Sequence, residues 1–153
     1  MRVVIQRVSE ASVAIDNKQK ASIDSGFMIL VGIEDQDAIN PEKEMNWLAN
    51  KIVNLRVFDD TDGVMNKSII DTQGDILLIS QFTLHASTKK GNRPSYIKAA
   101  KPEISEKIYT KFCSVLSEKL GKPIHTGVFG ADMKVSLTND GPVTIIIDTL
   151  NKE

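Results

Sequence analysis

The chain has 153 residues, of which 41% are hydrophobic and 25% are charged, with nine glycines, five prolines and one cysteine. These values predict a single globular domain over residues 1–153 whose core needs no disulfide, and the absence of a signal peptide or a long apolar stretch favours a cytoplasmic protein with no membrane partner. Nineteen Lys and Arg against twenty Asp and Glu give a net charge of −1, which argues against a protein that coats nucleic acid through overall positive charge.

The first third of the chain predicts strands followed by a helix. Apolar and polar residues alternate from Val3 to Ile15 and stop at the turn signal Asp16-Asn17, and a further strand is expected over Phe27 to Ile33. Asn40-Pro41-Glu42 is typical of a helix start, because Asn caps a helix and Pro fits its first position. An apolar stripe at helical spacing follows it, formed by Met45, Leu48, Ile52 and Leu55.

The middle of the chain predicts a buried strand that ends in polar residues. The turn signal Gly74-Asp75 introduces the apolar run Ile76 to Ile79, which leads into the segment Ser80-Gln81-Phe82-Thr83-Leu84. A second, longer helix is expected from Pro102 until Gly121 stops it. Cys113 lies on this helix and has no neighbouring base in the sequence, so we expect an inert side chain and not a nucleophile.

The last segment predicts two more strands. Met133, Val135 and Leu137 alternate with polar residues, and Val143 to Thr149 form a second β-type run. Between them, Asn139-Asp140-Gly141-Pro142 has the composition of a tight turn. We therefore expect a mixed α/β domain with six to eight strands in a largely antiparallel or mixed β-sheet and two main helices. Strands and helices do not alternate regularly, which argues against a doubly wound parallel sheet.

The sequence lacks the common signatures of metal and nucleotide sites. The only two histidines, His85 and His125, are forty residues apart, and no zinc-binding spacing, Walker A loop or dinucleotide fingerprint occurs. We therefore expect neither a metal nor a cofactor. On an extended strand Thr83 and His85 would share one face, so this pair is one candidate for a nucleophile and its base.

Two polar motifs at strand ends, Ser80 to Thr83 and Asn139 to Thr144, have two interpretations each. Their side chains either form a binding site or satisfy nearby backbone groups, and the residues alone leave both interpretations open. The same holds for residues 85–101, which carry Lys89, Lys90, Arg93, Lys98 and Lys101 and no acid. This segment is either a solvated loop or a surface for a phosphate backbone.

Five ordered motifs together resemble the D-aminoacyl-tRNA deacylase family. They are Met1 to Val13 (MRVVIQRVSEASV), Ser80 to Leu84 (SQFTL), Lys90 to Ser95 (KGNRPS), Phe129 to Met133 (FGADM) and Asn139 to Thr144 (NDGPVT). The resemblance extends from the first residue to about Asp148. It implies a homodimeric cytoplasmic enzyme, with active sites at the interface, that hydrolyses the ester between a D-amino acid and the 3′-terminal adenosine of tRNA. Selective action on D-amino acids would make the enzyme a chiral proofreader in translation quality control. The resemblance also implies removal of glycine from mischarged tRNA.

The resemblance also implies roles for individual residues. Gly141 and Pro142 would form a cis peptide that reaches into the pocket of the other subunit, and their carbonyls would clasp the ammonium group of the substrate. An L side chain would then be rejected sterically. The pocket itself would be lined by the catalytic segment Ser80, Gln81, Phe82 and Thr83 and by the substrate-binding residues Phe129, Gly130, Ala131, Met133 and Asn139.

The chemistry implied by the resemblance uses backbone groups and the ribose hydroxyl of the substrate. The N–H groups of Phe82 and Thr83 are the candidates for holding the ester carbonyl, and we expect the Phe82 ring to pack in the core, although it could instead stack on the terminal adenine. Lys89, Lys90 and Arg93 would contact acceptor-stem phosphates of tRNA, and DNA is not an expected partner. Two alternatives stay open: a non-catalytic domain that binds tRNA ends, and a hydrolase with Thr83 as its nucleophile.

Overall fold

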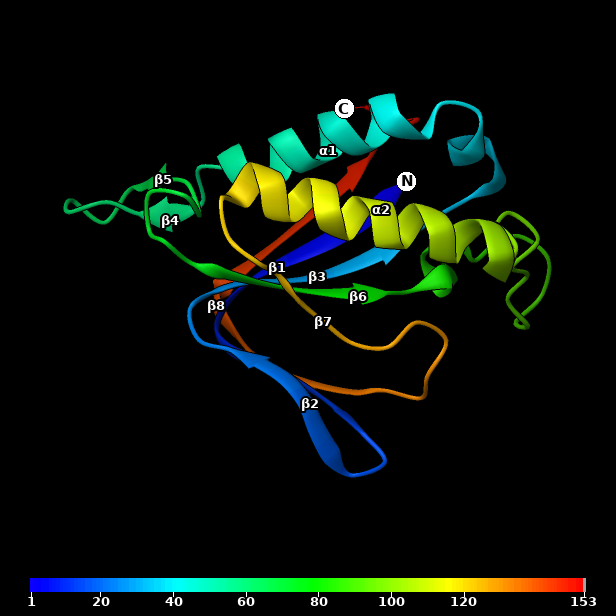
Figure 1. The fold of residues 1–153 in the computed structure, drawn as a ribbon, viewed down its shortest axis with the longest axis horizontal. Coiled ribbons are helices and arrows are strands. Elements are labelled where there is room, and N and C mark those ends of the chain that lie inside the picture. Colours follow the sequence, from blue (N-terminus) through cyan, green and yellow to red (C-terminus); the bar gives the residue numbers. More distant parts are fainter. Residues whose placement is uncertain (153) are drawn as a thin grey trace.

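A mixed β-sheet and two helices on one of its faces make up the fold. The computed structural model describes residues 1–152. Figure 1 shows α1 and α2 side by side across the sheet, both running in the same direction. The elements in chain order are β1 (Arg2–Ile15), β2 (Lys18–Ile23), β3 (Gly26–Gly32), η1 (Asp35–Ala38), α1 (Pro41–Asn54), β4 (Phe58–Asp59), β5 (Met65–Lys67), β6 (Asp75–Ser80), η2 (Phe82–His85), α2 (Pro102–Leu120), β7 (His125–Thr126) and β8 (Lys134–Asp148).

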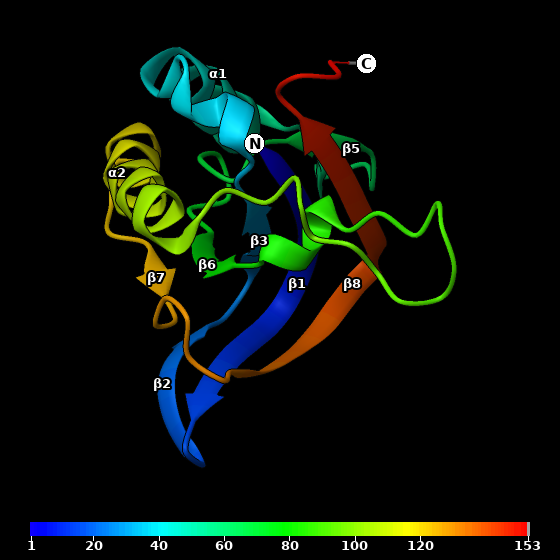
Figure 2. The same ribbon diagram turned by 90° about the vertical axis from the view of Figure 1, so that its right-hand side faces the viewer.

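Strand β1 organises the sheet because it has neighbours along both edges. One edge pairs with β8 over almost its whole length, while the other pairs first with β3 and then with β2. These three pairings are antiparallel, whereas β3–β6 and β6–β7 are parallel. The sheet curls until β2 approaches β6 and β7, which gives a nearly closed, barrel-like shape (Figure 2). The predicted mixed sheet with two main helices is confirmed.

Both faces of the central strands are buried, which explains their continuous apolar sequence. In β3 and β6, Phe27, Ile29 and Leu78 contribute to the larger core under the two helices. Their sequence neighbours Met28 and Leu77 belong to a second core inside the curl of the sheet. The period of two along each strand therefore assigns alternate residues to two different cores.

The two predicted helices begin where the sequence indicates. α1 starts at Pro41 and buries Met45, Leu48 and Ile52 of its apolar stripe. α2 starts at Pro102 and ends at Leu120, and the next residue, Gly121, has the left-handed φ of 79° that is common where a helix stops. Within the part of the chain that the structure describes, neither helix is long and apolar enough to cross a membrane.

The tight turn predicted at residues 139–142 is wrong. Residues 134–148 form one continuous strand, β8, which keeps its direction along β1. Gln6 pairs with Thr144 and Val8 pairs with Asn139. Between these two pairs β1 moves along by two residues, whereas β8 moves along by five. The extra residues leave the ladder as a bulge (140–143) in which Gly141 and Pro142 are exposed. Turn-forming residues therefore produce a protrusion here and not a hairpin.

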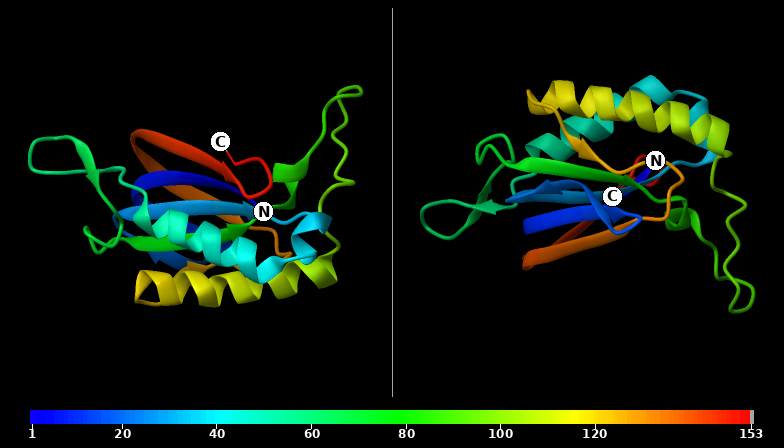
Figure 3. Two further views of the ribbon diagram at one scale, coloured as in Figure 1. Left: turned by 90° about the horizontal axis from the view of Figure 1, so that it is seen from above. Right: turned by 60° about the horizontal axis from the view of Figure 1, so that its bottom comes forward.

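Met1 and the segment that follows β8 meet beside η1. The backbone N–H of Thr149 donates to the carbonyl of Met1, and the amino group of Met1 bonds to the Thr149 hydroxyl at 2.7 Å. The same amino group forms a fully buried ion pair with Asp37. Viewed from above and from below, the loop between η2 and α2 projects away from this compact body (Figure 3).

Candidate active site

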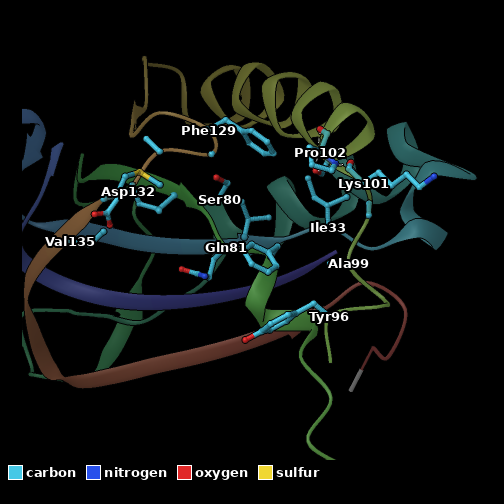
Figure 4. A pocket seen from close by; sticks show the side chains of 18 residues that line it. Ile33, Ser80, Gln81, Tyr96, Ala99, Lys101, Pro102, Phe129, Asp132 and Val135 are labelled. Carbon is cyan, nitrogen blue, oxygen red and sulfur yellow. Dashed lines mark hydrogen bonds between the residues drawn. The ribbon is translucent and has the colours of Figure 1, made fainter. Parts of the chain in front are cut away.

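A mainly apolar cavity opens where β6 leaves the sheet, and we call it the aminoacyl pocket after the substrate that the resemblance implies. It has a volume of about 730 Å³. Its walls come from the end of β6, the start of η2, the first turn of α2 and the segment 129–135 (Figure 4). Of the residues predicted for a site, seven line it: Ser80, Gln81, Phe82, Phe129, Gly130, Ala131 and Met133.

The segment Ser80-Gln81-Phe82 enters the pocket because the strand ladder stops there. The N–H of Gln81 donates to the carbonyl of Val31 at 2.7 Å, and the chain then turns into η2. The N–H groups of Phe82 and Thr83 are the first in this short helix, so they have no intrahelical acceptor. No acceptor for them occurs among residues 1–152, which leaves two backbone donors free next to the pocket.

Thr83 and His85 do not form the strand pair that the sequence suggested as one alternative. Residues 82–85 are a 3-10 helix, in which residues two apart point in different directions. The Thr83 hydroxyl accepts a hydrogen bond of 2.6 Å from the Gln81 amide and does not line the pocket. His85 is only 3% exposed, and its Nδ1 lies 3.6 Å from a carboxylate oxygen of Glu34.

The opposite wall of the pocket is held by contacts with α2. The ring of Phe129 packs against Tyr109, with 5.8 Å between ring centroids, and the Tyr109 hydroxyl donates to the carbonyl of Leu78. Burial raises the pKa of Tyr109, so its hydroxyl keeps this proton at neutral pH. A Cβ atom at Gly127 would lie 2.3 Å from the sulfur of Met133, so glycine there lets Met133 pack into the wall.

An exposed aromatic pair stands at the mouth of the pocket. Phe82 is 56% exposed and Tyr96 is 40% exposed, and their rings meet edge to face with centroids 5.1 Å apart. The expectation that Phe82 packs in the core is therefore wrong, because η2 carries its side chain outward from the sheet. Tyr96 comes from the projecting loop, so the pair joins two segments that the sequence separates by fourteen residues.

Gly141 and Pro142 are presented by a bulge that two side chains support. Their peptide bond is cis, as the resemblance implies. The amide of Asn139 donates to the carbonyls of Arg7 and Val143, which closes the neck of the bulge. Arg7 is 7% exposed, and its Nε donates to the carbonyl of Asp140 at 3.1 Å. Polar contacts thus fix the backbone on both sides of the exposed dipeptide.

Within one copy of the chain, the bulge and the aminoacyl pocket lie at opposite ends of β3. Arg7 beside the bulge pairs with Phe27, while Ser80 in the pocket pairs with Val31. Four residues of extended strand separate these pairs by about 13 Å. Gly141, Pro142 and Asn139 accordingly do not line the pocket of their own chain.

The remaining predicted residues lie outside the pocket. Lys89, Lys90 and Arg93 are exposed in the projecting loop, whereas Lys101 is at the pocket rim before α2. Burial raises the pKa of the Cys113 thiol to about 11, which agrees with an inert cysteine. No group of three metal-binding side chains occurs in the described part of the chain.

Sequence reasoning missed Arg7 and Tyr96. The sequence did contain a signal for Arg7, because a charged residue within an apolar strand is unusual. In the structure this side chain is buried. The partners of Arg7, the carbonyls of Val57 and Asp140, come from segments far away in the chain. For Tyr96 the only signal in the sequence was an aromatic residue within a basic loop. No local pattern indicates that its ring contacts Phe82.

Comparisons with known proteins agree on one family. A family model described as D-Tyr-tRNA(Tyr) deacylase matches residues 4–148. A "D-aminoacyl-tRNA deacylase" of Bacteroides fragilis (strain YCH46) is 68% identical over 100% of both chains, and one of Flavobacterium psychrophilum is 62% identical over the same span.

Two solved structures share the fold. One is titled "c-Myc DNA Unwinding Element Binding Protein", with a TM-score of 0.90 and 40% identity over 97% of this chain and 98% of that chain. The other is titled as a probable eukaryotic D-amino acid tRNA deacylase, with a TM-score of 0.80 and 17% identity over 95% of this chain and 97% of that chain. At 17% identity, the second likeness concerns the fold alone.

Proposed function

We propose that this chain, which belongs to the D-Tyr-tRNA(Tyr) deacylase family of hydrolases, hydrolyses the ester between a D-amino acid and the 3′-terminal adenosine of tRNA. The observation that carries the proposal is the aminoacyl pocket, which combines an apolar chamber with the free backbone donors of Phe82 and Thr83 at its edge. A chamber of about 730 Å³ suits a nucleoside with an attached amino acid.

The reaction needs little from side chains. An aminoacyl ester is already activated, and its ribose 2′-hydroxyl lies next to the reacting carbonyl. Positioning the ester, together with donors that hold its oxygen as negative charge develops, supplies much of the rate. The N–H groups of Phe82 and Thr83 are the donors we assign to this oxyanion. Thr83 does not line the pocket, which agrees with a mechanism that does not use its hydroxyl.

Chirality is selected by Gly141 and Pro142 of a second copy of the chain. Within one copy the bulge lies about 13 Å along β3 from its own pocket, so a homodimer is required to bring the two together. The dipeptide is exposed on a supported bulge, which suits a rigid group that enters another molecule. Its two carbonyls would clasp the substrate ammonium group, leaving room for a D side chain and none for an L side chain.

Two consequences follow from selection by steric rejection. A D side chain directed toward solvent makes few contacts, so many D-amino acids should be accepted. Glycine has no side chain to reject, so glycine on mischarged tRNA should also be released. The enzyme would thus act as a chiral proofreader in the cytoplasm.

The tRNA body would lie over the projecting loop. Lys89, Lys90 and Arg93 are exposed there, and residues 85–101 contain no acid. Contacts of this kind replace counterions on the phosphate backbone and give salt-dependent affinity without reading sequence. The loop also brings Tyr96 to the mouth of the pocket, so tRNA binding and the reacting end share one segment.

Deacylation of matched D-tyrosyl-tRNA and L-tyrosyl-tRNA by the purified protein, with a chelator present, tests the proposal. We expect rapid release of D-tyrosine and release of L-tyrosine at the spontaneous rate. Equal release of both would contradict the chiral clasp.

A non-catalytic domain that binds tRNA ends is the second candidate, because the basic loop alone would suffice for binding. Binding of tRNA without release from either ester would establish it. One structural relative is titled as a DNA-binding protein, so duplex DNA belongs in the binding assay as a competitor. Displacement of tRNA by an equal concentration of duplex DNA would contradict a tRNA-specific surface.

A further inference from the structure

The β4–β5 hairpin, residues 58–67, is a well-defined projection with apolar side chains near its tip. We call it the acidic hairpin. The carboxylate of Asp60 accepts hydrogen bonds from the N–H groups of Asp62 at 2.9 Å and Val64 at 3.0 Å. The N–H of Asp60 donates to the carbonyl of Val64 at 2.8 Å. This turn presents two apolar side chains to solvent, because Val64 is 58% exposed and Met65 is 54% exposed.

Arg7 joins the acidic hairpin to the bulge at residues 140–143. Its Nη1 donates to the carbonyl of Val57, at the base of the hairpin, and lies 3.3 Å from the carboxylate of Asp59. Its Nε donates to the carbonyl of Asp140 in the bulge. The side chain that makes these contacts is buried, so one guanidinium fixes the hairpin and the bulge relative to each other. Wherever the bulge docks, the hairpin therefore lies beside it.

The projecting loop borders the aminoacyl pocket that the bulge of a second copy would enter, because Tyr96 of this loop lines the pocket. Figures 1 and 3 show the acidic hairpin and the projecting loop at opposite ends of one copy. In a twofold dimer each copy gives its bulge and receives the bulge of its partner. The hairpin of one copy then lies next to the loop of the other, and this contact occurs twice.

The base of the projecting loop also carries exposed apolar side chains. Ile97 is 85% exposed, and with Phe82 and Tyr96 it makes three exposed apolar residues at or beside the mouth of the pocket. Scattered apolar residues on a surface are ordinary, whereas a group of neighbours is typical of an interface. Val64 and Met65 on the acidic hairpin form the second such group, so both surfaces bury apolar area if they meet.

The charges of the two surfaces are opposite. Residues 58–66 contain three acids and no base, and residues 85–101 contain five bases and no acid. Within the part of the chain that the structure describes, Lys89, Lys90 and Arg93 form no ion pair. Opposite charges favour one orientation of two surfaces, although a single exposed ion pair adds little stability. The excess of bases leaves positive charge on the loop for tRNA.

We propose that the acidic hairpin of one copy docks at the base of the projecting loop of a second copy, with Val64 and Met65 against Ile97. Each aminoacyl pocket is then bordered by two elements of the partner, the bulge and the hairpin. This inference rests on the proposed function for the dimer and for the entry of the bulge. The hairpin contact itself rests on the link through Arg7 and on the apolar and charged residues of the two surfaces.

The first test measures dimer dissociation without tRNA by sedimentation equilibrium. We expect Met65→Ser and Ile97→Ser each to raise the dissociation constant about 10-fold, because each removes apolar contact area. The double variant should raise it by less than the product of the two factors, since the residues share one contact. Ile39→Ser is the matched control, because Ile39 is 84% exposed and lies in neither surface.

Three results would overturn the docking. Independent effects of the two substitutions would show that the two residues do not meet, and an equal effect in Ile39→Ser would show that the change is not specific. A dimer that neither substitution weakens would remove the hairpin contact and leave the clasp intact. A chain that stays monomeric at every concentration would overturn the docking and the clasp together.

The second test is cross-linking, which does not depend on hydrolysis. In a Cys113→Ala background, Thr61→Cys in the hairpin and Asn92→Cys in the loop place thiols at two exposed positions. With a flexible bismaleimide we expect a covalent dimer from the chain that carries both cysteines and none from either single variant. No covalent dimer from the double variant, or the same yield from a single variant, would overturn the proposal. Loss of the cross-link with uncharged tRNA would assign the loop to tRNA instead.

Discussion

The guanidinium of Arg7 and the backbone of Asp140 are joined across 133 positions of sequence. Nε of Arg7 lies 3.1 Å from the carbonyl oxygen of Asp140 and 3.3 Å from its carboxylate, and Nη1 donates to the carbonyl of Val57. A buried charge with these partners fixes the bulge that presents Gly141 and Pro142. Arg7 is therefore the link between the first strand and the proposed chirality clasp.

Replacing Arg7 by lysine should damage the clasp, because an ammonium group cannot reproduce the planar set of donors. We expect deacylation of D-tyrosyl-tRNA to fall about 10- to 100-fold and stability to fall by about 1.5 to 3 kcal/mol, the range for hydrogen bonds of charged groups. Single-turnover kinetics and urea unfolding measure the two effects. Arg56→Lys is the matched control, because Arg56 is exposed. Unchanged kinetics in Arg7→Lys would show that the bulge needs no such support.

Pro142→Ala tests the dipeptide itself. The proposed clasp needs both carbonyls in one orientation, so we expect kcat/KM for D-tyrosyl-tRNA to fall at least about 10-fold and the ratio of D to L rates to approach one. Pro123→Ala, an exposed proline after α2, serves as the control. A Pro142 variant with undiminished rate and chirality would remove the clasp from the mechanism.

Thr83→Ala separates backbone chemistry from nucleophilic catalysis. The Thr83 hydroxyl accepts from Gln81 and does not line the pocket, so we expect the single-turnover rate to stay within about threefold of the unaltered chain. Loss of a nucleophile costs about 10⁴-fold or more. A loss of that size, with recovery in Thr83→Ser, would instead establish the hydrolase that uses Thr83 covalently.

Phe82→Ala tests whether the exposed ring stacks on a base. Stacking of a base on an aromatic side chain contributes about 1 to 3 kcal/mol, so we expect KM for D-aminoacyl-tRNA to rise about 5- to 150-fold with a smaller change in kcat. Phe82→Leu keeps apolar bulk without the aromatic face and should lose most of the same affinity. Full affinity in the leucine variant would mean that the ring acts only by packing against Tyr96.

Asp148 should make stability depend on pH. Burial opposes ionisation of Asp148, but hydrogen bonds from the N–H of Leu150 and from Arg2 outweigh it and lower the pKa of Asp148. A lowered pKa of Asp148 in the folded state stabilises the protein fully above the ordinary carboxyl pKa of about 3.9, and this contribution is lost as the pH falls from that value through the lower pKa of the folded state.

Urea unfolding of Asp148→Asn at two pH values measures this contribution. At pH 7 we expect the variant to be less stable than the unaltered chain, and near pH 3 we expect the difference to shrink. Asp62→Asn, in the exposed β4–β5 turn, is the control. A difference that stays constant between the two pH values would contradict the ionic origin.

The amino-acid sequence by itself determined the two long helices, the main apolar strand segments and the family. Pro41 and Pro102 fix helix starts through local backbone geometry, and Gly121 fixes a stop for the same reason. Alternating or continuous apolar residues indicate how many faces of a strand are buried. These signals depend on neighbours in the chain, so they can be read without knowing the tertiary contacts.

Only the tertiary structure decided which backbone conformation the two polar motifs, at residues 80–85 and 139–142, adopt. Residues 139–142 have the composition of a turn, yet pairing of β8 with β1 on both sides turns them into a bulge. Thr83 and His85 were placed on a strand face, but the ladder ends at Gln81 and the chain coils into η2. Three contacts join segments that are distant in the sequence: His85 with Glu34, Arg7 with Asp140, and Phe82 with Tyr96. Their formation depends on long-range packing energy, which no local pattern of residues reveals.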